Sequence, residues 1–269
     1  QTDVVKDFAG RTIFIPGNHD WYSGGPKGLE RQEEYIEDKL GKNTFLPEEG
    51  CPIRKVEIND EVELIIVDTE WYLTKWDKFP TLNDNCEIRT RNRFFLEYES
   101  LIKKARGKTT VIALHHPLFT NGPHGGQFSV GQHMTPIPVL GTLKNVLRRA
   151  GGVSPADIQY KRYDEFRDRI ITLSQDNNKI IFVSGHEHSL QYLVESNLPQ
   201  IVSGAGSKTT PTRNVGGGQF SYGSPGYARL DVFKDGSSHV SFFSTKENKV
   251  VFETEVLQED RPIITDYPD

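Results

Sequence analysis

The sequence predicts an α/β fold with a layered core, and three observations support this prediction. Short apolar runs bounded by turn residues recur along the first two thirds of the chain, as is typical of buried strands. Later runs are preceded by segments with helical spacing, and strands that alternate with helices indicate a layered α/β core. After Ser189 the pattern changes to short strands joined by hairpin turns.

In the first part of the chain we expect four strands, at residues 12–15, 63–68, 109–114 and 179–184. Two helices should precede the last two strands. Residues 93–106 place Phe94, Tyr98 and Leu101 at helical spacing, and Gly107 provides a stop. The second helix covers residues 163–175 and ends before a polar turn.

After Ser189 the sequence predicts an antiparallel half with strands at 191–194, 200–203, 227–233, 239–244 and 250–256. We interpret residues 1–269 as a single domain in which two sheets pack together. Two long loops, 117–141 and 204–226, are rich in glycine, and loops of this length are usually functional or mobile.

Composition restricts the classes of function. The chain has 269 residues and a formal charge of −5, which disfavours nucleic acid as a stable partner but not a small anionic substrate. No run of eighteen apolar residues is present. The favoured interpretation of Cys51 and Cys86 is two unlinked thiols, and a single bridge is the alternative outside the cytoplasm.

Histidines follow three of the expected strands. The first strand ends in Asn18-His19-Asp20, the third in His115-His116 and the fourth in His186-Glu187-His188. Ligand sites of α/β sheets form at the carboxyl ends of strands, and imidazole nitrogens and amide oxygens suit a first-row transition metal. An extended backbone would also place the rings of His186 and His188 on one side of the strand. The sequence therefore predicts a metal site.

These motifs resemble those of a known family. Gly17-Asn18-His19-Asp20, His115-His116-Pro117 and Gly185-His186-Glu187-His188 are similar to the later motifs of the calcineurin-like metallophosphoesterases. The string from Gly185 to Tyr192, followed by Ser203-Gly204-Ala205-Gly206, resembles the tartrate-resistant purple acid phosphatase branch. The resemblance runs from Arg11 to about Glu255. It implies a four-layer α/β/β/α sandwich and a phosphoric ester hydrolase.

The resemblance also implies roles for individual residues. Asn18, His115 and His186 match ligands of a second metal, and His188 matches a ligand of a first metal. His19 matches an imidazole that contacts the phosphate and protonates the leaving oxygen, with Asp20 orienting it. Two iron, manganese or zinc ions would activate a water to attack a phosphomonoester. Substrate contacts are expected at His116, His124 and Arg213.

Part of the family pattern is missing. An Asp-x-His motif and a Gly-Asp-x-x-(Asp/Tyr) motif should precede Gly17, and the first ten residues contain neither. Asp3 and Asp7 are poor replacements, because their segment is typical of a helix end. We therefore expect an N-terminally incomplete domain that lacks its first βαβ portion, with the missing segment as one conceivable partner.

Several alternatives stay open at this stage. The hydrolase could act on phosphodiesters or nucleotides, or the chain could be a non-catalytic interaction module with the same fold. Lys208 and Arg213 either reach a phosphate or are solvated charges, and His124 and His133 either close over a substrate or bind nothing. Asp68 is interpreted as a structural residue and His239 as a surface residue. Relatives of this branch suggest a periplasmic or secreted protein.

Overall fold

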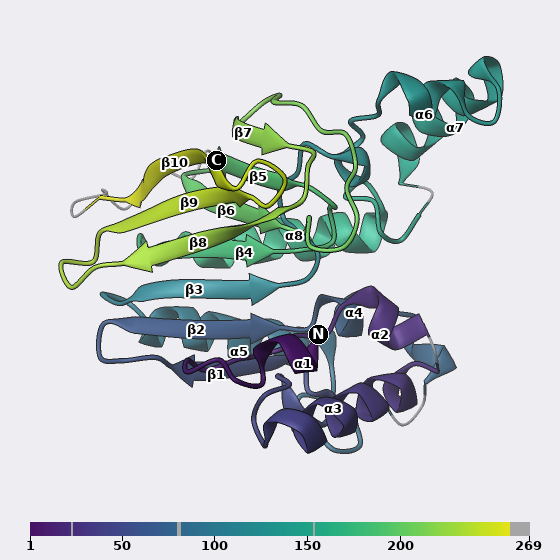
Figure 1. Cartoon of the computed structure of the whole chain (residues 1–269). Helices are drawn as coiled ribbons and strands as arrows, with labels where there is room; N and C mark the ends of the chain where they lie inside the picture. The colour runs from purple at the N-terminus through teal and green to yellow at the C-terminus, as the bar shows by residue number, and fades with distance from the viewer. Residues whose placement is uncertain (23, 80–81, 153, 259–269) are drawn as a thin grey trace.

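Two β-sheets form the centre of the fold in the computed structural model, which describes residues 1–22, 24–79, 82–152 and 154–258 (Figure 1). The large sheet has the strand order β1-β2-β3-β4-β6-β5-β7 and the small sheet the order β10-β9-β8. The strands of the large sheet are β1 (Ile53–Glu57), β2 (Val62–Val67), β3 (Thr109–Leu114), β4 (Ile180–Ser184), β5 (Leu190–Glu195), β6 (Leu198–Ser203) and β7 (Gly218–Tyr222). Those of the small sheet are β8 (Gly226–Val232), β9 (Ser238–Ser244) and β10 (Lys249–Leu257).

The helices lie between these strands along the chain. The α-helices are α1 (Thr2–Val5), α2 (Asn18–Tyr22), α3 (Pro26–Leu40), α4 (Thr69–Leu73), α5 (Arg91–Lys104), α6 (Val130–Met134), α7 (Pro138–Gly151) and α8 (Lys161–Ser174). Short 3-10 turns are η1 (Glu48–Gly50), η2 (Trp76–Lys78) and η3 (Pro123–Gly125). In the part of the chain that the structure describes, no helix has the length and apolar character needed to cross a membrane.

Parallel pairing positions the histidine motifs. β2 pairs with β3, β3 with β4 and β4 with β6 in parallel, and Leu114 at the end of β3 lies opposite Ser184 at the end of β4. The residues that follow these two strands therefore emerge side by side at one edge of the large sheet.

Each face of the large sheet buries a different layer. On one face, helices α4, α5 and α8 contribute Trp71, Phe94 and Phe166 to the main apolar core. On the other face, Tyr192 of β5 packs with Val240 and Phe242 of the small sheet. The predicted α/β class and the two packed sheets are confirmed.

Most expected elements are present within one or two residues. β3 covers residues 109–114 as predicted, and α5 and α8 overlap the two predicted helices. β8, β9 and β10 form antiparallel hairpins, but β5 and β6 join the large sheet, where β6 runs parallel to β4. Residues 259–269 of the predicted single domain lie outside the described residues, and the single-domain interpretation stays a prediction.

The predicted strand at 12–15 is wrong. This segment makes one isolated parallel bridge, between Phe14 and Phe45. Ile13 and Ile15 pack against a small cluster that includes Leu46 and Val56. The apolar residues of segment 12–15 therefore reflect side-chain packing, and the segment does not form the backbone hydrogen bonds of a full strand.

Two further expectations need correction. The predicted loops 117–141 and 204–226 contain α6, the start of α7, and β7, and Gly131 and Gly141 lie inside the two helices. The two cysteines are not unlinked thiols: Cys51 and Cys86 form a disulfide, with 5.5 Å between their Cα atoms. Their separation of 35 residues in the chain concealed this proximity in space.

Candidate metal centre

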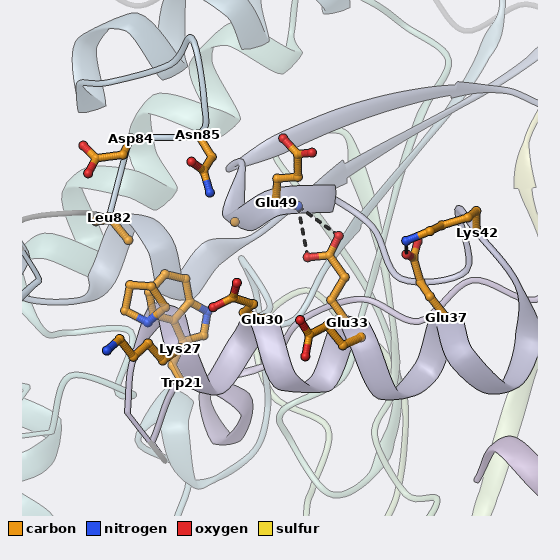
Figure 2. A pocket seen from close by; sticks show the side chains of 13 residues that line it. Trp21, Lys27, Glu30, Glu33, Glu37, Lys42, Glu49, Leu82, Asp84 and Asn85 are labelled. Carbon is orange, nitrogen blue, oxygen red and sulfur yellow. Dashed lines mark hydrogen bonds and ion pairs between the residues drawn. The ribbon is translucent and has the colours of Figure 1, made fainter.

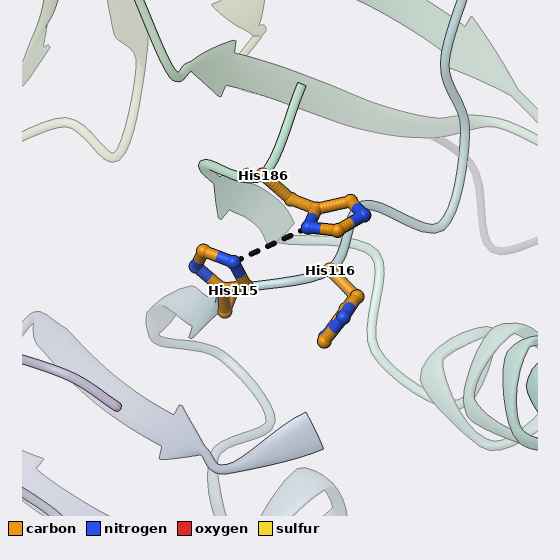
Figure 3. A group of neighbouring side chains, drawn as sticks. All are labelled: His115, His116 and His186. Carbon is orange, nitrogen blue, oxygen red and sulfur yellow. Dashed lines mark hydrogen bonds between the residues drawn. The ribbon is translucent and has the colours of Figure 1, made fainter. Parts of the chain in front are cut away.

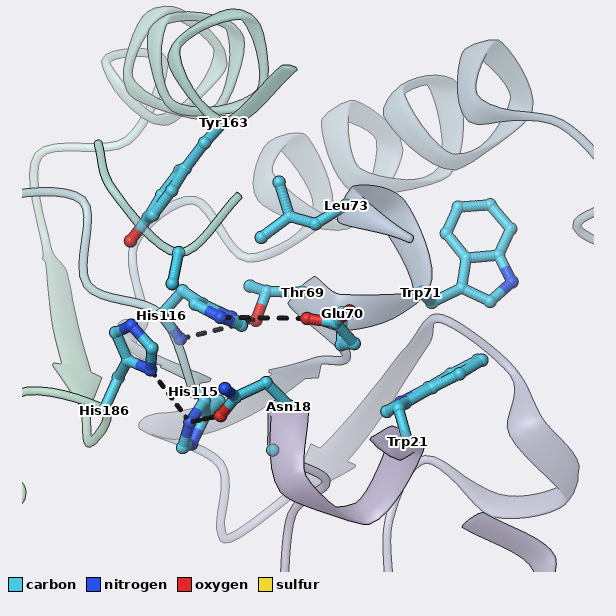
Figure 4. A network of polar contacts seen from close by, with 12 residues as sticks. Asn18, Trp21, Thr69, Glu70, Trp71, Leu73, His115, His116, Tyr163 and His186 are labelled. Carbon is cyan, nitrogen blue, oxygen red and sulfur yellow. Dashed lines mark hydrogen bonds and ion pairs between the residues drawn. The ribbon is translucent and has the colours of Figure 1, made fainter. Parts of the chain in front are cut away.

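Three backbone segments meet at the carboxyl ends of β3 and β4. His115 and His116 follow β3 directly, and Gly185 after β4 donates its N–H to the carbonyl of His115 at 3.2 Å. Asn18 begins α2 and reaches the same place (Figure 4). Asn18, His115 and the turn after β4 therefore lie close together, and their role as a metal site stays a prediction.

Short contacts join the side chains at this point. His115 Nε2 lies 2.9 Å from Asn18 Oδ1 (Figure 4). The same nitrogen lies 3.3 Å from His186 Nδ1 (Figure 3). His186 has a φ of 64°, in the left-handed region that non-glycine residues rarely adopt. This sharp turn directs the His186 ring toward His115, and local strain of this kind often marks a functional site.

Gly17 makes room for the His115 ring. A Cβ atom at this position would lie 2.8 Å from both Cε1 and Nδ1 of His115, closer than side-chain contacts allow. The Gly17 N–H donates to Asp20 Oδ2 at 2.7 Å, which holds the turn before α2. The glycine of the Gly-Asn-His-Asp motif thus permits close approach of backbone and ring.

His116 belongs to the same cluster. Ligand nitrogens of His115, His116 and His186 all lie within 4.8 Å of one another. His116 is fully buried, its Nδ1 lies 2.6 Å from Thr69 Oγ1 and its Nε2 lies 3.8 Å from Glu70 Oε2. This burial disagrees with the expected substrate contact at His116, because a side chain in this position does not face solvent.

Burial keeps these rings neutral. Desolvation lowers the pKa of His115 to about 4, and it holds the pKa values of His116 and His186 well below the usual value for histidine. Neighbouring imidazoles act in the same direction in all three cases. Near pH 7 the cluster therefore offers unprotonated nitrogens, which is the form that binds a metal.

The donor atoms fit a transition metal. Two ligands bound to one ion at about 2.1 Å lie about 3.0–3.4 Å apart at tetrahedral or octahedral angles. The distances of 2.9 Å from His115 to Asn18 and 3.3 Å from His115 to His186 are close to this range. Asn18, His115 and His186 would hold the ion, and His116 offers a further nitrogen within 4.8 Å of the other two histidines.

A buried ionic network supports the cluster from the side of α7. The ring of His124 lies 4.3 Å from that of His186, and its Nδ1 lies 3.2 Å from Asp157 Oδ1. Arg148 of α7 donates to Asp157 Oδ2 at 2.9 Å. Burial raises the pKa of Asp157, but the bonds from Arg148 and His124 outweigh this effect and hold the pKa below its ordinary value.

Glu187 ties the same region to the backbone. It is buried, and its Oε1 accepts a hydrogen bond from the His124 N–H at 2.8 Å. A Cβ atom at Gly122 would lie 2.3 Å from this carboxylate, so glycine is required there. Glu187, the middle residue of the His-Glu-His motif, is therefore a positioning residue. The motif is the sequence feature that could have identified it.

A second polar group lies beside the cluster, around Asp68. Its Oδ1 accepts from the Trp71 N–H at 3.1 Å and caps α4, and its Oδ2 accepts from Trp21 Nε1 at 3.0 Å. Burial raises the pKa of Asp68 to about 7 and that of Glu70 to about 8. The structural interpretation of Asp68 agrees with these contacts.

The remaining predicted residues lie around the cluster. His188 is outside the histidine trio, because residues 186–189 form bends instead of an extended strand and the expected period of two does not apply. Burial, followed by the charge of Lys208, lowers the pKa of His188. Arg213 is exposed and donates to Gln127 Oε1 at 3.3 Å.

The first helical turn of α2 carries the two predicted catalytic residues. His19 is exposed, with its ring 4.9 Å from that of Tyr22. In the described residues Asp20 holds Gly17 and makes no recorded bond to His19, so its orienting role stays a prediction. Tyr22 instead accepts a hydrogen bond from the Asn18 amide.

Sequence reasoning missed Thr69, Glu70 and Asp157. Thr69 and Glu70 follow the strand-end Asp68, so the same strand-end argument could have found them. The sequence around Asp157 contains no motif that indicates a functional residue. Its partners Arg148 and His124 lie 9 and 33 residues away in the chain.

The cavity above α3 is a different feature. It has a volume of about 750 Å³ and is lined by Glu30, Glu33 and Glu37, with Trp21 at one end (Figure 2). Glu33 accepts two hydrogen bonds from the Glu49 N–H, each at 3.0 Å, and burial raises the pKa of its carboxyl. Its acidic lining opposes a phosphate group, so we place the chemistry at the histidine cluster instead.

Comparison with known proteins agrees with this geometry. The family model described as calcineurin-like phosphoesterase matches residues 2–190, which include every histidine motif. The chain belongs to the calcineurin-like phosphoesterase family. No curated protein matches it.

Two solved structures share the fold of this calcineurin-like phosphoesterase. One is GAP50, "the anchor in the inner membrane complex of Plasmodium", with a TM-score of 0.58 and 13% identity over 94% of this chain and 69% of that chain. The other is the purple acid phosphatase PPD1 from yellow lupin seeds, with a TM-score of 0.51 and 13% identity over 91% of this chain. This chain spans 38% of the lupin protein.

Proposed function

We propose that this calcineurin-like phosphoesterase is a metal-dependent hydrolase of phosphomonoesters. The observation that carries the proposal is the convergence of Asn18, His115 and His186, whose donor atoms are separated as ligands of one ion would be. Family membership supports phosphoester hydrolysis in general. The fold shared with a plant purple acid phosphatase supports the choice of a monoester.

Different residues would bind the metal, position its ligands and donate a proton. Asn18, His115 and His186 hold the metal, and buried Glu187 and Asp157 fix the positions of His124 and the turn after β4. When bound, iron, manganese or zinc supplies Lewis-acid activation of water and of the phosphoryl oxygen. His19 is exposed beside Asn18, where it can give a proton to the leaving oxygen. His188, at the far end of the same turn, is proposed as a ligand of the other ion.

The Cys51–Cys86 disulfide supports a periplasmic or secreted location, because structural disulfides persist in oxidising compartments. Reduction of the purified protein tests this part separately. If the bridge is structural, reductant should lower the thermal midpoint. If the midpoint is unchanged, this support for the location is lost.

The proposal is tested on the full chain by elemental analysis and by hydrolysis of p-nitrophenyl phosphate and bis(p-nitrophenyl) phosphate. We expect bound metal and faster monoester hydrolysis. Asn18→Ala and His115→Ala should each lower metal affinity by more than about a hundredfold, because each removes a proposed ligand. His239→Ala on β9 is the matched control and should change neither quantity.

The outcomes separate the alternatives. Faster diester hydrolysis would assign the chain to the phosphodiesterases. Bound metal with no hydrolysis of either ester would favour a non-catalytic module. Parent-like metal content and activity in both alanine variants would reject the proposed centre.

A further inference from the structure

Helix α7 turns its polar side toward the protein. Gly141 and Asn145 are buried, and Arg148 bonds to the buried Asp157. The opposite side carries five apolar residues with exposed fractions between 52% and 75%, namely Val139, Leu140, Leu143, Val146 and Leu147. At 100° per residue these five fall on one continuous arc. An ordinary surface helix has the reverse arrangement, with its apolar stripe facing the core.

Helix α6 and the connection to α7 extend this surface. Val130, Met134 and Ile137 are also more than half exposed. The two helices pack closely, because a Cβ atom at Gly141 would lie 2.4 Å from the His133 carbonyl. Together α6 and α7 form a hairpin, residues 130–151, that projects away from both sheets (Figure 1).

The charge of this region differs from that of the whole chain. The chain has 37 acidic residues and a formal charge of −5, yet no Asp or Glu occurs between Glu99 and Asp157. Lys144 and Arg149 are exposed on α7. By helical position they lie on opposite borders of the apolar arc. Long cationic side chains in this position cover apolar surface with their stems and place their charges at the rim.

We propose that the α6–α7 hairpin docks on an anionic lipid bilayer, with the apolar arc among the acyl chains and Lys144 and Arg149 at the headgroups. The arrangement of an apolar face bordered by cations is that of a helix lying in the membrane interface. α7 has 14 residues and is about 21 Å long, shorter than the hydrocarbon core of about 30 Å. It would therefore lie on the membrane.

The charge pattern disfavours a second copy as the occupant. In a two-fold symmetric dimer the same patch appears on both partners. Lys144 and Arg149 of one copy would then lie near the same cations of the other copy. The segment contains no carboxylate that could pair with them. An anionic bilayer supplies the missing negative charge.

Docking would also set the position of the histidine cluster. Arg148 on the inner side of α7 bonds to Asp157, which bonds to His124 beside His186. These contacts hold the base of the hairpin against the cluster, so a docked hairpin keeps the cluster close to the membrane surface. The proposal does not depend on hydrolysis, and its test does not measure it.

The test is flotation of the full chain with vesicles of phosphatidylcholine alone or phosphatidylcholine with phosphatidylserine. We expect binding to the anionic vesicles. A triple variant, Leu140→Ser, Leu143→Ser and Leu147→Ser, should lose at least about a hundredfold in affinity, because three apolar side chains no longer enter the acyl region. Lys144→Gln with Arg149→Gln should lose about tenfold or more on anionic vesicles only, because two cations no longer face the anionic headgroups.

The control variant carries Ile58→Ser, Leu96→Ser and Phe233→Ser. These side chains are exposed by 51%, 53% and 52%, which matches the three leucines of α7, but they lie elsewhere on the molecule. The control should bind like the parent chain, and the thermal midpoint of every variant should stay near that of the parent.

Three results would overturn the proposal. The first is no binding of the parent chain to anionic vesicles, and the second is equal binding by the parent and the leucine variant. The third is a dimer, seen by light scattering, that the leucine variant dissociates while vesicles bind neither protein. That last result would assign the hairpin to an interface between copies. Equal binding to both vesicle types would reject the part of the proposal that concerns anionic lipid.

Discussion

The histidine cluster and the α6–α7 hairpin place polar and apolar groups in opposite ways. At the cluster, imidazoles and carboxylates are buried beside polar partners, as with His116 beside the Thr69 hydroxyl and Asp157 beside the Arg148 guanidinium. On the hairpin, leucines and valines are exposed while Asn145 is buried. Neither arrangement favours stability by itself, since buried polar groups are desolvated and exposed apolar groups remain in water. Both are therefore better explained by binding than by folding.

Asp68 offers the largest expected effect on the buried side of this comparison. Burial raises its pKa from 3.8 to about 7, so the folded protein holds a proton that the unfolded chain releases. The free energy of unfolding should therefore fall as the pH rises from about 4 to about 7, by up to about 1.4 kcal/mol per pH unit. Asp68→Asn removes this titration and should flatten the curve.

Chemical unfolding at several pH values, with a chelator present, measures this slope. Glu70 has a raised pKa of about 8 and contributes in the same direction, so part of the slope should persist in the Asp68→Asn variant. Parallel curves for the parent and the variant would show that Asp68 is already ionised in the folded protein.

Asp157 tests the link between the two regions. Asp157→Asn removes the charge that pairs with Arg148 and should cost about 3 kcal/mol, because the cation is left without its buried partner. Asp231→Asn is the matched control. It breaks an Arg229–Asp231 pair of 2.9 Å at the surface and should cost less than about 1 kcal/mol.

Unfolding midpoints of both variants give the comparison. Similar midpoints for Asp157→Asn and Asp231→Asn would mean that the hairpin is not held to the histidine cluster by this ion pair. The base of α7 would then have to be positioned by other contacts, such as that between Arg148 and the ring of Phe128.

Gly17 tests the packing of the cluster itself. Gly17→Ala places a methyl group 2.8 Å from the His115 ring, which must move away from Asn18. We expect metal affinity to fall by about 10- to 100-fold, as for other changes that misplace a ligand. Gly206→Ala in the loop after β6 is the control, because a Cβ atom there meets nothing within 4 Å. Titration calorimetry with zinc or manganese measures both variants, and equal affinities would exclude Gly17 as a positioning residue.

Local pattern was sufficient to predict much of the fold. The apolar runs of β2, β3 and β4 and the periodicity of α5 and α8 lie within single segments, and each is found close to its predicted bounds. The strand-end rule then brought together His115 and His186, because the parallel pairing of β3 and β4 fixes where these two strands end. Asn18 joins them from the start of α2, although no strand precedes it.

What escaped prediction depends on contacts between distant segments. The Cys51–Cys86 bridge and the Asp157 network join residues that only the folded chain brings together. The bend at His186 was missed for another reason. Alternation along a strand holds only for extended backbone, and a φ of 64° ends the strand before His188. The outward-facing apolar arc of α7 was missed because a loop was predicted up to residue 141 and no element was predicted for residues 142–151.

Leu143 gives the smallest expected effect and the sharpest contrast between the two regions. Leu143→Ser on the exposed arc of α7 should change the free energy of unfolding by less than about 0.5 kcal/mol, mostly through helix propensity. Leu101→Ser on α5, where the leucine is buried, should cost about 3 kcal/mol or more because it leaves a cavity and buries a hydroxyl. Thermal midpoints measured at a low and a high protein concentration compare the two. A large loss for Leu143→Ser that grows with concentration would mean that the arc is covered by a second copy in solution. A small decrease in the thermal midpoint at both concentrations means that the arc is uncovered in the isolated protein. The proposed binding to a bilayer requires such an uncovered surface.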